Sequence, residues 1–135
     1  MYMFDSCILI DLSKRKLPIA YELLMKSDAS LFKVPAVVKA ELLVGAEKAR
    51  DPEQERFRVE TLLLPFEIVP FDGACAVKYA QIRAHLERKG EQIGGNDYLI
   101  AATALAHSAI LVTNNVDEFK RVPGLTIEEW AEVNF

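Results

Sequence analysis

Short runs of apolar residues alternate with longer stretches of helical spacing along this chain. The apolar runs predict strands at 2–5, 30–34, 66–69, 110–113 and 125–127. Apolar positions three and four residues apart predict helices at 7–12, 18–26, 36–50, 52–64, 73–89 and 98–107. Strands and helices that alternate in this way are typical of a mainly parallel sheet covered by helices on both faces. We therefore expect a three-layer α/β/α fold with four to five strands.

Several helix boundaries are marked by residues that suit one particular end. Pro18 and Pro52 suit the first turn of a helix, where a missing N–H costs no hydrogen bond. Asp51 and Asp72 are able to accept hydrogen bonds from the first free N–H groups of the helices that follow them. Gly90 suits the left-handed conformation that ends many helices. These residues support the boundaries of three of the expected helices.

The composition agrees with a single domain that spans residues 1–135. The chain is 51% hydrophobic and 27% charged, which is far from the composition of disordered proteins. The 16 basic and 20 acidic residues give a net charge of −4, which at first disfavours a polyanionic partner. If three acids bind a metal ion, 17 acidic residues face 16 basic ones elsewhere, and the overall charge no longer excludes RNA.

Three features lead us to expect a cytoplasmic protein with no membrane span. The two cysteines, Cys7 and Cys75, form no Cys-x-x-Cys pair, so we expect both as small core residues in a reducing compartment. The first residues lack the basic region of a signal peptide and include Asp5. The longest uncharged stretch, 98–116, is interrupted by polar residues such as His107, well short of the ~20 apolar residues that a span requires.

Three acidic residues stand in apolar surroundings, where an unpaired carboxylate is costly. Asp5 closes the first expected strand, and ligands bind at the carboxyl ends of parallel strands. Glu41 has apolar residues three and four positions away on either side, and Asp97 follows two glycines before an expected helix. Simpler interpretations exist for each: a helix cap for Asp5, a solvent-facing side chain for Glu41 and a first-turn acid for Asp97.

Together the three carboxylates predict a site for a hard divalent cation such as Mg²⁺, which Mn²⁺ can replace. Such an ion lowers the pKa of a bound water and neutralises the charge that grows on a phosphate. The chain has only two histidines, His85 and His107, so a histidine-based triad or zinc site is poorly supported. Ser6 lacks the Gly-x-Ser-x-Gly setting of a nucleophile, so helix capping or a hydrogen bond to a metal-bound water suits it better.

Four motifs carry a resemblance that extends over nearly the whole chain. They are Phe4-Asp5-Ser6-Cys7-Ile8, Ala40-Glu41-Leu42, Gly94-Gly95-Asn96-Asp97 and Leu111-Val112-Thr113-Asn114-Asn115. In their sequence and order they resemble PIN-domain ribonucleases, and the last motif with the Glu118-Phe119 that follows it resembles the VapC toxins of bacterial toxin–antitoxin pairs.

The resemblance implies a PIN-like fold and a magnesium-dependent endoribonuclease. It makes Asp5, Glu41 and Asp97 both the catalytic residues and the metal ligands. It further implies a structured RNA substrate of the tRNA or rRNA class, a homodimer, and a VapB-type antitoxin whose C-terminal segment covers the site of the toxin.

Two positions depart from the family pattern. Cys7 replaces the amide of the usual Asp-Thr-Asn motif, whereas Ser6 keeps the hydroxyl group. Asn115, two residues after the strand-end Thr113, replaces an acid, for which Glu118 is a possible substitute. Turn chemistry is the simpler interpretation of Asn115, and a solvated helix position that of Glu118. Ser6, Thr113, Asn115 and Glu118 are therefore secondary candidates for the site.

The sequence does not identify the residues that contact RNA. Candidates for phosphate contact are Lys14, Arg15, Lys16, Lys78, Arg83, Arg88, Lys120 and Arg121. For each of them, the solvated-surface interpretation is favoured.

Two other functions compete with the nuclease. One is a PIN-like protein that binds RNA or an antitoxin but has lost activity through the Cys7 and Asn115 changes. The other is a phosphoacceptor receiver domain, which is also a small parallel α/β fold. A receiver needs paired acids after its first strand and a lysine after its last, and this chain lacks both. Incubation of the purified protein with RNA and Mg²⁺ separates the first alternative from an active nuclease.

Overall fold

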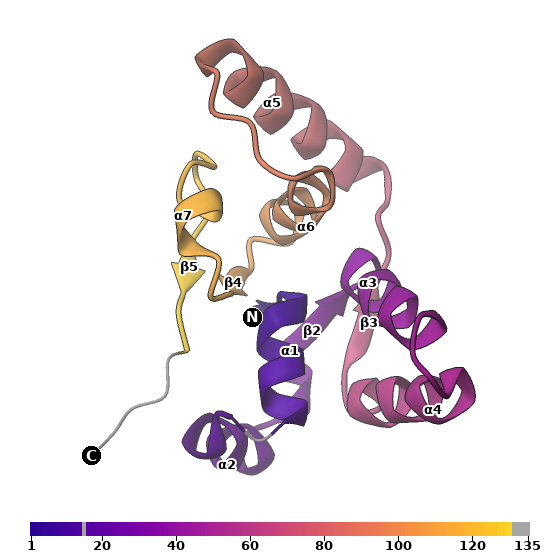
Figure 1. The fold of residues 1–135 in the computed structure, drawn as a ribbon. Coiled ribbons are helices and arrows are strands. Elements are labelled where there is room, and N and C mark those ends of the chain that lie inside the picture. Colours follow the sequence, from indigo (N-terminus) through magenta and orange to yellow (C-terminus); the bar gives the residue numbers. More distant parts are fainter. Residues whose placement is uncertain (15, 131–135) are drawn as a thin grey trace.

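Five parallel strands form the centre of the computed structural model, which describes residues 1–14 and 16–130 (Figure 1). The strands are β1 (Tyr2–Phe4), β2 (Phe32–Pro35), β3 (Glu67–Val69), β4 (Ile110–Val112) and β5 (Ile127–Glu128). Their order is β3-β2-β1-β4-β5, and every neighbouring pair is parallel. The prediction of a mainly parallel sheet of four to five strands is therefore confirmed.

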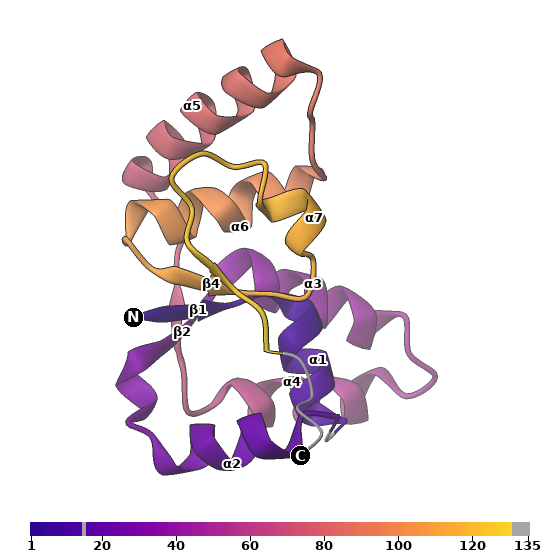
Figure 2. The same cartoon turned by 90° about the vertical axis from the view of Figure 1, so that its left-hand side faces the viewer.

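Helices cover both faces of this sheet. They are α1 (Ser6–Ser13), α2 (Pro18–Lys26), α3 (Ala36–Glu47), α4 (Pro52–Leu63), α5 (Gly73–Lys89), α6 (Gly95–Ala106) and α7 (Val116–Phe119), with a 3₁₀ turn at Ala29–Leu31. Figures 1 and 2 show α5 and α6 on one side of the sheet and α1, α2 and α4 on the other. This arrangement is the expected three-layer α/β/α fold. Within the described ranges, none of the helices is long and apolar enough to cross a membrane.

The expected helix boundaries are largely confirmed by their capping contacts. Pro18 and Pro52 stand in the first turns of α2 and α4. The side chains of Asp51 and Asp72 accept hydrogen bonds from the N–H groups of residues 54 and 75, and Gly90 ends α5 with a φ of 68°. Capping can be predicted from the sequence because each of these contacts is local.

Several boundaries differ from the expectation, and three of them are informative. β2 begins at Phe32 rather than at residue 30, because the Asp28 side chain accepts from the Ser30 N–H and closes a 3₁₀ turn. α3 ends at Glu47, three residues early. α6 begins at Gly95, so Asp97 lies in the first turn of the helix instead of preceding it.

The order in which strands are added to the sheet reverses at β1, and this reversal positions the site. β1 pairs with β2 on one side and with β4 on the other. The connections that leave β1 and β4 therefore separate at one edge of the sheet, which is where open α/β folds bind their ligands. Asp5 follows β1 directly and Thr113 follows β4 directly, so both lie at this edge.

Candidate active site

Asp5 is held rigidly at the end of β1, and it is also the N-cap of α1. Its side chain is 5% exposed. The Ser6 N–H donates to Oδ1 over 2.8 Å, and the Thr113 hydroxyl donates to Oδ2 over 2.7 Å. The helix-cap interpretation of Asp5 is thus correct, and the same carboxylate also faces the other acids of the site.

Thr113 and Cys7 surround the second oxygen of Asp5. Thr113 is fully buried and accepts a hydrogen bond from the Asn115 N–H over 2.9 Å. The Cys7 thiol donates to Asp5 Oδ2 over 3.5 Å and accepts from the Asn114 N–H over 3.4 Å. Burial and the nearby Asp5 charge raise the pKa of this thiol, which keeps it a donor. Cys7 therefore performs, more weakly, both hydrogen-bonding roles of the amide that it replaces.

The expectation for the two cysteines is confirmed for one and wrong for the other. Cys75 is fully buried in the core, as expected. Cys7 is only half-buried and is part of the site, because the first turn of α1 points it toward Asp5 and Thr113. Both are free thiols.

Glu41 projects from α3 with one oxygen enclosed by protein. Among the described residues no hydrogen-bond partner reaches this buried atom, Oε1. Burial and the charge of Asp5 raise the pKa of Glu41, while the Asn96 and Ser6 side chains lower it in part. The surrounding apolar stripe is narrower than expected, since Val38 is buried but Val44 is 53% exposed. Glu41 lies at the edge of this stripe, where an oxygen can be desolvated and still face a ligand.

Asp97 turns back over the start of its own helix. A Cβ atom at Gly94 would lie 3.1 Å from Asp97 Oδ2, so the glycine permits this close approach. The pKa of Asp97 is raised to about 8, first by burial, then by Glu118, and further by Asp5 and Glu41. The pKa of Glu118 is lowered, chiefly by its hydrogen bond with Asp97. The hydrogen bond between the two side chains thus favours a proton on Asp97 and a charge on Glu118.

Asn115 and Glu118, two secondary candidates that follow Thr113, also belong to this cluster. The Asn115 side-chain amide donates to Glu118 Oε2 over 3.1 Å and orients that carboxylate toward Asp97. The simpler interpretation of Glu118 as a solvated helix residue is therefore wrong. Asn115 itself supplies no carboxylate, and Glu118 brings the fourth acid to the site from α7.

Two contributors were missed by sequence reasoning. Asn96 faces Glu41, although it was quoted only as part of the glycine-rich motif. Arg121 donates to the Gln92 carbonyl over 3.0 Å and helps to lower the pKa of Glu118. It had been considered only as a phosphate contact. The sequence held no indication of these pairings, because the partners of Asn96 and Arg121 are distant in the chain.

Three other candidates for phosphate contact are engaged elsewhere or not described. The Arg83 guanidinium pairs with Glu87 over 2.7 Å and stacks on the rings of Tyr79 and Tyr98. Lys120 pairs with Asp117 over 3.2 Å. Arg15 lies outside the described residues.

The chemistry of this donor set fits a hydrated divalent cation. In residues 1–14 and 16–130, no three histidine, cysteine, aspartate or glutamate side chains are grouped tightly enough to hold a metal ion directly. Nevertheless, burial and neighbouring carboxylates raise the pKa values of Glu41 and Asp97, and one buried oxygen of Glu41 has no hydrogen-bond partner among the described residues. Mg²⁺ usually keeps several of its waters and binds through one or two carboxylates, so a looser cluster suits it.

Comparison with known proteins agrees with the fold and with the motifs. The PIN domain family model matches residues 2–125. The ribonuclease VapC2 of Rickettsia felis is 40% identical over 134 residues, which cover 96% of this chain and 98% of that protein. A Salmonella typhimurium protein named tRNA(fMet)-specific endonuclease VapC is 39% identical over 98 residues, covering 73% of this chain and 74% of that one.

Solved structures give the same result. DNA-bound VapBC from Salmonella typhimurium matches with a TM-score of 0.90 and 34% identity, covering 96% of this chain and 98% of that chain. VapBC2 from Rickettsia felis, bound to a promoter DNA fragment, matches with a TM-score of 0.87 and 38% identity over the same shares of the two chains. The chain therefore belongs to the PIN domain family. Its relatives within that family are VapC ribonucleases, which confirms the resemblance inferred from the sequence.

Proposed function

We propose that this protein is the toxin of a VapBC-type toxin–antitoxin pair and acts as a metal-dependent endoribonuclease. It would hydrolyse phosphodiester bonds of a structured RNA of the tRNA or rRNA class. The observation that carries the proposal is the convergence of Asp5, Glu41, Asp97 and Glu118 at the sheet edge, with a buried unpartnered oxygen on Glu41. The VapC names of the relatives, one of them a tRNA endonuclease, support the RNA substrate.

In this mechanism Asp5, Glu41 and Asp97 would hold Mg²⁺ or Mn²⁺ in the ionised-carboxylate form of the site, with Glu118 beside them. A bound divalent ion lowers the pKa of water and offsets charge on the scissile phosphate. Asp5 stays fixed because the Ser6 N–H and the Thr113 hydroxyl bind its two oxygens. Glu118 beside Asp97 has a lowered pKa, so it stays ionised and is the member of the pair able to take a proton from attacking water.

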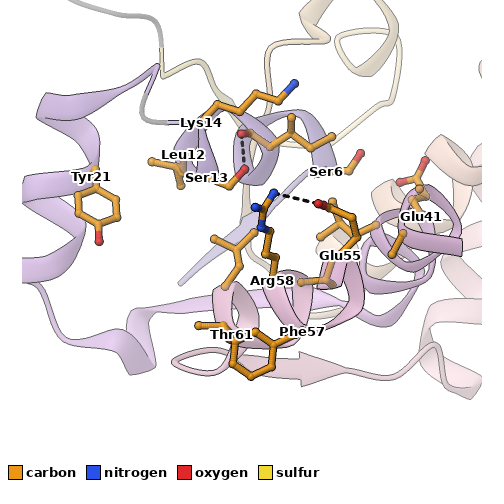
Figure 3. Close-up of a pocket in the computed structure, with 16 residues that line it drawn as sticks. Ser6, Leu12, Ser13, Lys14, Tyr21, Glu41, Glu55, Phe57, Arg58 and Thr61 are labelled. Carbon is orange, nitrogen blue, oxygen red and sulfur yellow. Dashed lines mark hydrogen bonds and ion pairs between the residues drawn. The ribbon is translucent and has the colours of Figure 1, made fainter. Parts of the chain in front are cut away.

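A partly apolar cleft leads away from the site and suits an antitoxin segment. The cleft measures about 940 Å³ and extends from Ser6 and Glu41 along α1, α3 and α4. Figure 3 shows Tyr21 on the opposite side of the cleft from Glu41, with the Glu55–Arg58 ion pair between them. Phe57 on α4 also lines the cleft and is 73% exposed. An antitoxin segment lying here would cover both the apolar surface and the acids.

The remaining parts of the proposal concern assembly and location. We expect a homodimer in the cytoplasm, and the two free thiols suit a reducing compartment. Several neighbours were solved as VapBC complexes, which supports an antitoxin partner.

A second candidate function is a PIN-like protein that binds RNA or antitoxin without cleaving RNA. Two observations favour it: Cys7 replaces an amide with a weaker hydrogen-bonding group, and the acids are not grouped tightly enough to hold a metal directly.

RNA cleavage tests the nuclease function. Purified protein with total RNA and Mg²⁺ or Mn²⁺ should cleave, and EDTA should stop the reaction. Asp5→Asn and Asp97→Asn should each lower the rate by about 100-fold or more, since each removes a carboxyl group that would hold the metal ion. Glu22→Gln, which changes an exposed acid on α2, is the matched control and should cleave normally. Equal residual cleavage by wild type and Asp5→Asn would leave only the binding function.

A further inference from the structure

The segment that leads into α6 is held by side chains from α6 itself and from the region of α7. We call residues 91–94 the entry segment. α6 begins after Gly94, which has no side chain, so the helix has no side-chain cap at its N-cap position. The entry segment matters because it directly precedes the turn that carries Asp97.

Three contacts fix three consecutive residues of the entry segment. The Gln92 carbonyl accepts a hydrogen bond from Arg121 Nη1 over 3.0 Å. The Ile93 N–H donates to the buried Tyr98 hydroxyl over 3.3 Å. The Gly94 N–H lies close enough to the Glu118 carboxylate to favour its charged form. Two of these contacts come from α7 or the residues just after it.

Arg121 connects the two elements that carry the acid pair. It follows α7 and its own N–H donates to the Glu118 carbonyl over 3.1 Å, so it lies one turn beyond Glu118. Its guanidinium reaches across to Gln92, 29 residues earlier in the chain. On the other side of Glu118, Asn115 holds the carboxylate. The distance between Asp97 and Glu118 therefore depends on how firmly α7 is joined to the entry segment.

We propose that Arg121 is a positioning residue that holds the entry segment against α7. It thereby keeps the Asp97 and Glu118 carboxyl groups within hydrogen-bonding distance of each other. Its effect on catalysis rests on the nuclease function proposed above, but its effect on the entry segment does not. A planar guanidinium can bind a carbonyl and still face Glu118, whereas a lysine offers a single charged point. Arg121→Lys should therefore hold the entry segment against α7 only in part.

Hydrogen exchange on the full-length protein tests the contact directly. In Arg121→Met the amides of Ile93 and Tyr98 should exchange about tenfold faster than in wild type, because the entry segment opens more often. Amides in β1 and β4 should keep their rates. Lys120→Met is the matched control, because Lys120 is the adjacent cation, is exposed and pairs only with Asp117 among the described residues.

Steady-state kinetics with RNA separate positioning from phosphate binding. As a positioning residue, Arg121→Met should lower kcat about tenfold, leave the KM for RNA nearly unchanged and be partly rescued by Arg121→Lys. A raised KM, an unchanged kcat and a weaker salt dependence would identify a phosphate contact and overturn the proposal. Unchanged exchange at Ile93 and Tyr98 would also overturn it. If wild type cleaves no RNA, the nuclease function fails, and exchange alone decides the role of Arg121.

Discussion

Asp97 is the residue whose charge depends most directly on its neighbours. It lies beside Glu118 and faces Asp5 and Glu41, and its pKa is raised from 3.8 to about 8. The folded protein therefore keeps a proton that the unfolded chain releases between about pH 4 and pH 8. The contribution of Asp97 to the free energy of unfolding therefore decreases as the pH rises through that window. A cation that binds the deprotonated Asp97 carboxylate in the folded protein raises the free energy of unfolding instead.

We expect Asp97→Asn to remove this dependence, because the amide resembles the protonated acid and can still donate to Glu118. At pH 8.5 the variant should melt about 3–5 °C above wild type, and at pH 4 the two should coincide. Mg²⁺ should raise the Tm of wild type at pH 8.5 but not that of the variant. Thermal melting across this pH range, with the exposed Asp117→Asn as control, measures the effect. Parallel curves for wild type and Asp97→Asn would contradict it.

At the residue scale, most of the candidate site was predictable from the sequence. Asp5, Glu41 and Asp97 were selected because charges in apolar surroundings require compensation, and the structure brings them to one edge of the sheet. Their catalytic role stays a prediction. Asn96 and Arg121 were not predictable as partners, since each acts on a side chain or carbonyl that only the folded chain brings near.

At the element scale, the strands and long helices were predictable and α7 was not. The long helices have several turns of apolar spacing, and α4 and α5 also have local side-chain caps. α7 has four residues, too few for a helical repeat to be visible. Its position depends instead on contacts with the entry segment and with Asp97, which belong to other elements.

The entry segment also depends on α6 itself, through the Tyr98 hydroxyl. Tyr98→Phe should destabilise the protein by about 1–2 kcal/mol, because it leaves the buried Ile93 N–H without a partner while the ring still packs. Tyr79→Phe is the matched control, since its hydroxyl contacts the exposed Arg83, which water can solvate instead. Urea unfolding of both variants measures the difference. Equal losses in the two variants would show that the Ile93 contact is unimportant.

At the scale of the whole molecule, the site and the cleft form one continuous surface. The site lies at β1, where the order of strand addition reverses. The cleft continues from Ser6 and Glu41 along α1, α3 and α4. The alternation of elements predicted a parallel sheet but not the strand order, because the side on which each new strand adds is decided by packing between distant segments.

Phe57 and Val77 allow the proposed antitoxin surface to be tested. Phe57 lines the cleft, whereas Val77 is exposed on α5 in the opposite layer, so both tolerate a charge. Phe57→Asp should weaken binding of a co-expressed VapB-type antitoxin at least about tenfold, and Val77→Asp should not. Both should keep the wild-type Tm and RNA cleavage. Calorimetry on the purified proteins gives the affinities, and unchanged binding by Phe57→Asp would place the antitoxin elsewhere.

The hydrogen bond between Thr113 and Asp5 joins residues 108 positions apart, and it constrains the timing of activation. β1 comes early in the described sequence, whereas its neighbour β4 and the acid of α7, Glu118, come much later. A nascent chain that stops before them therefore holds Asp5 without the hydroxyl that orients it. The candidate site is therefore complete only when β4 and α7 have joined β1 in the fold.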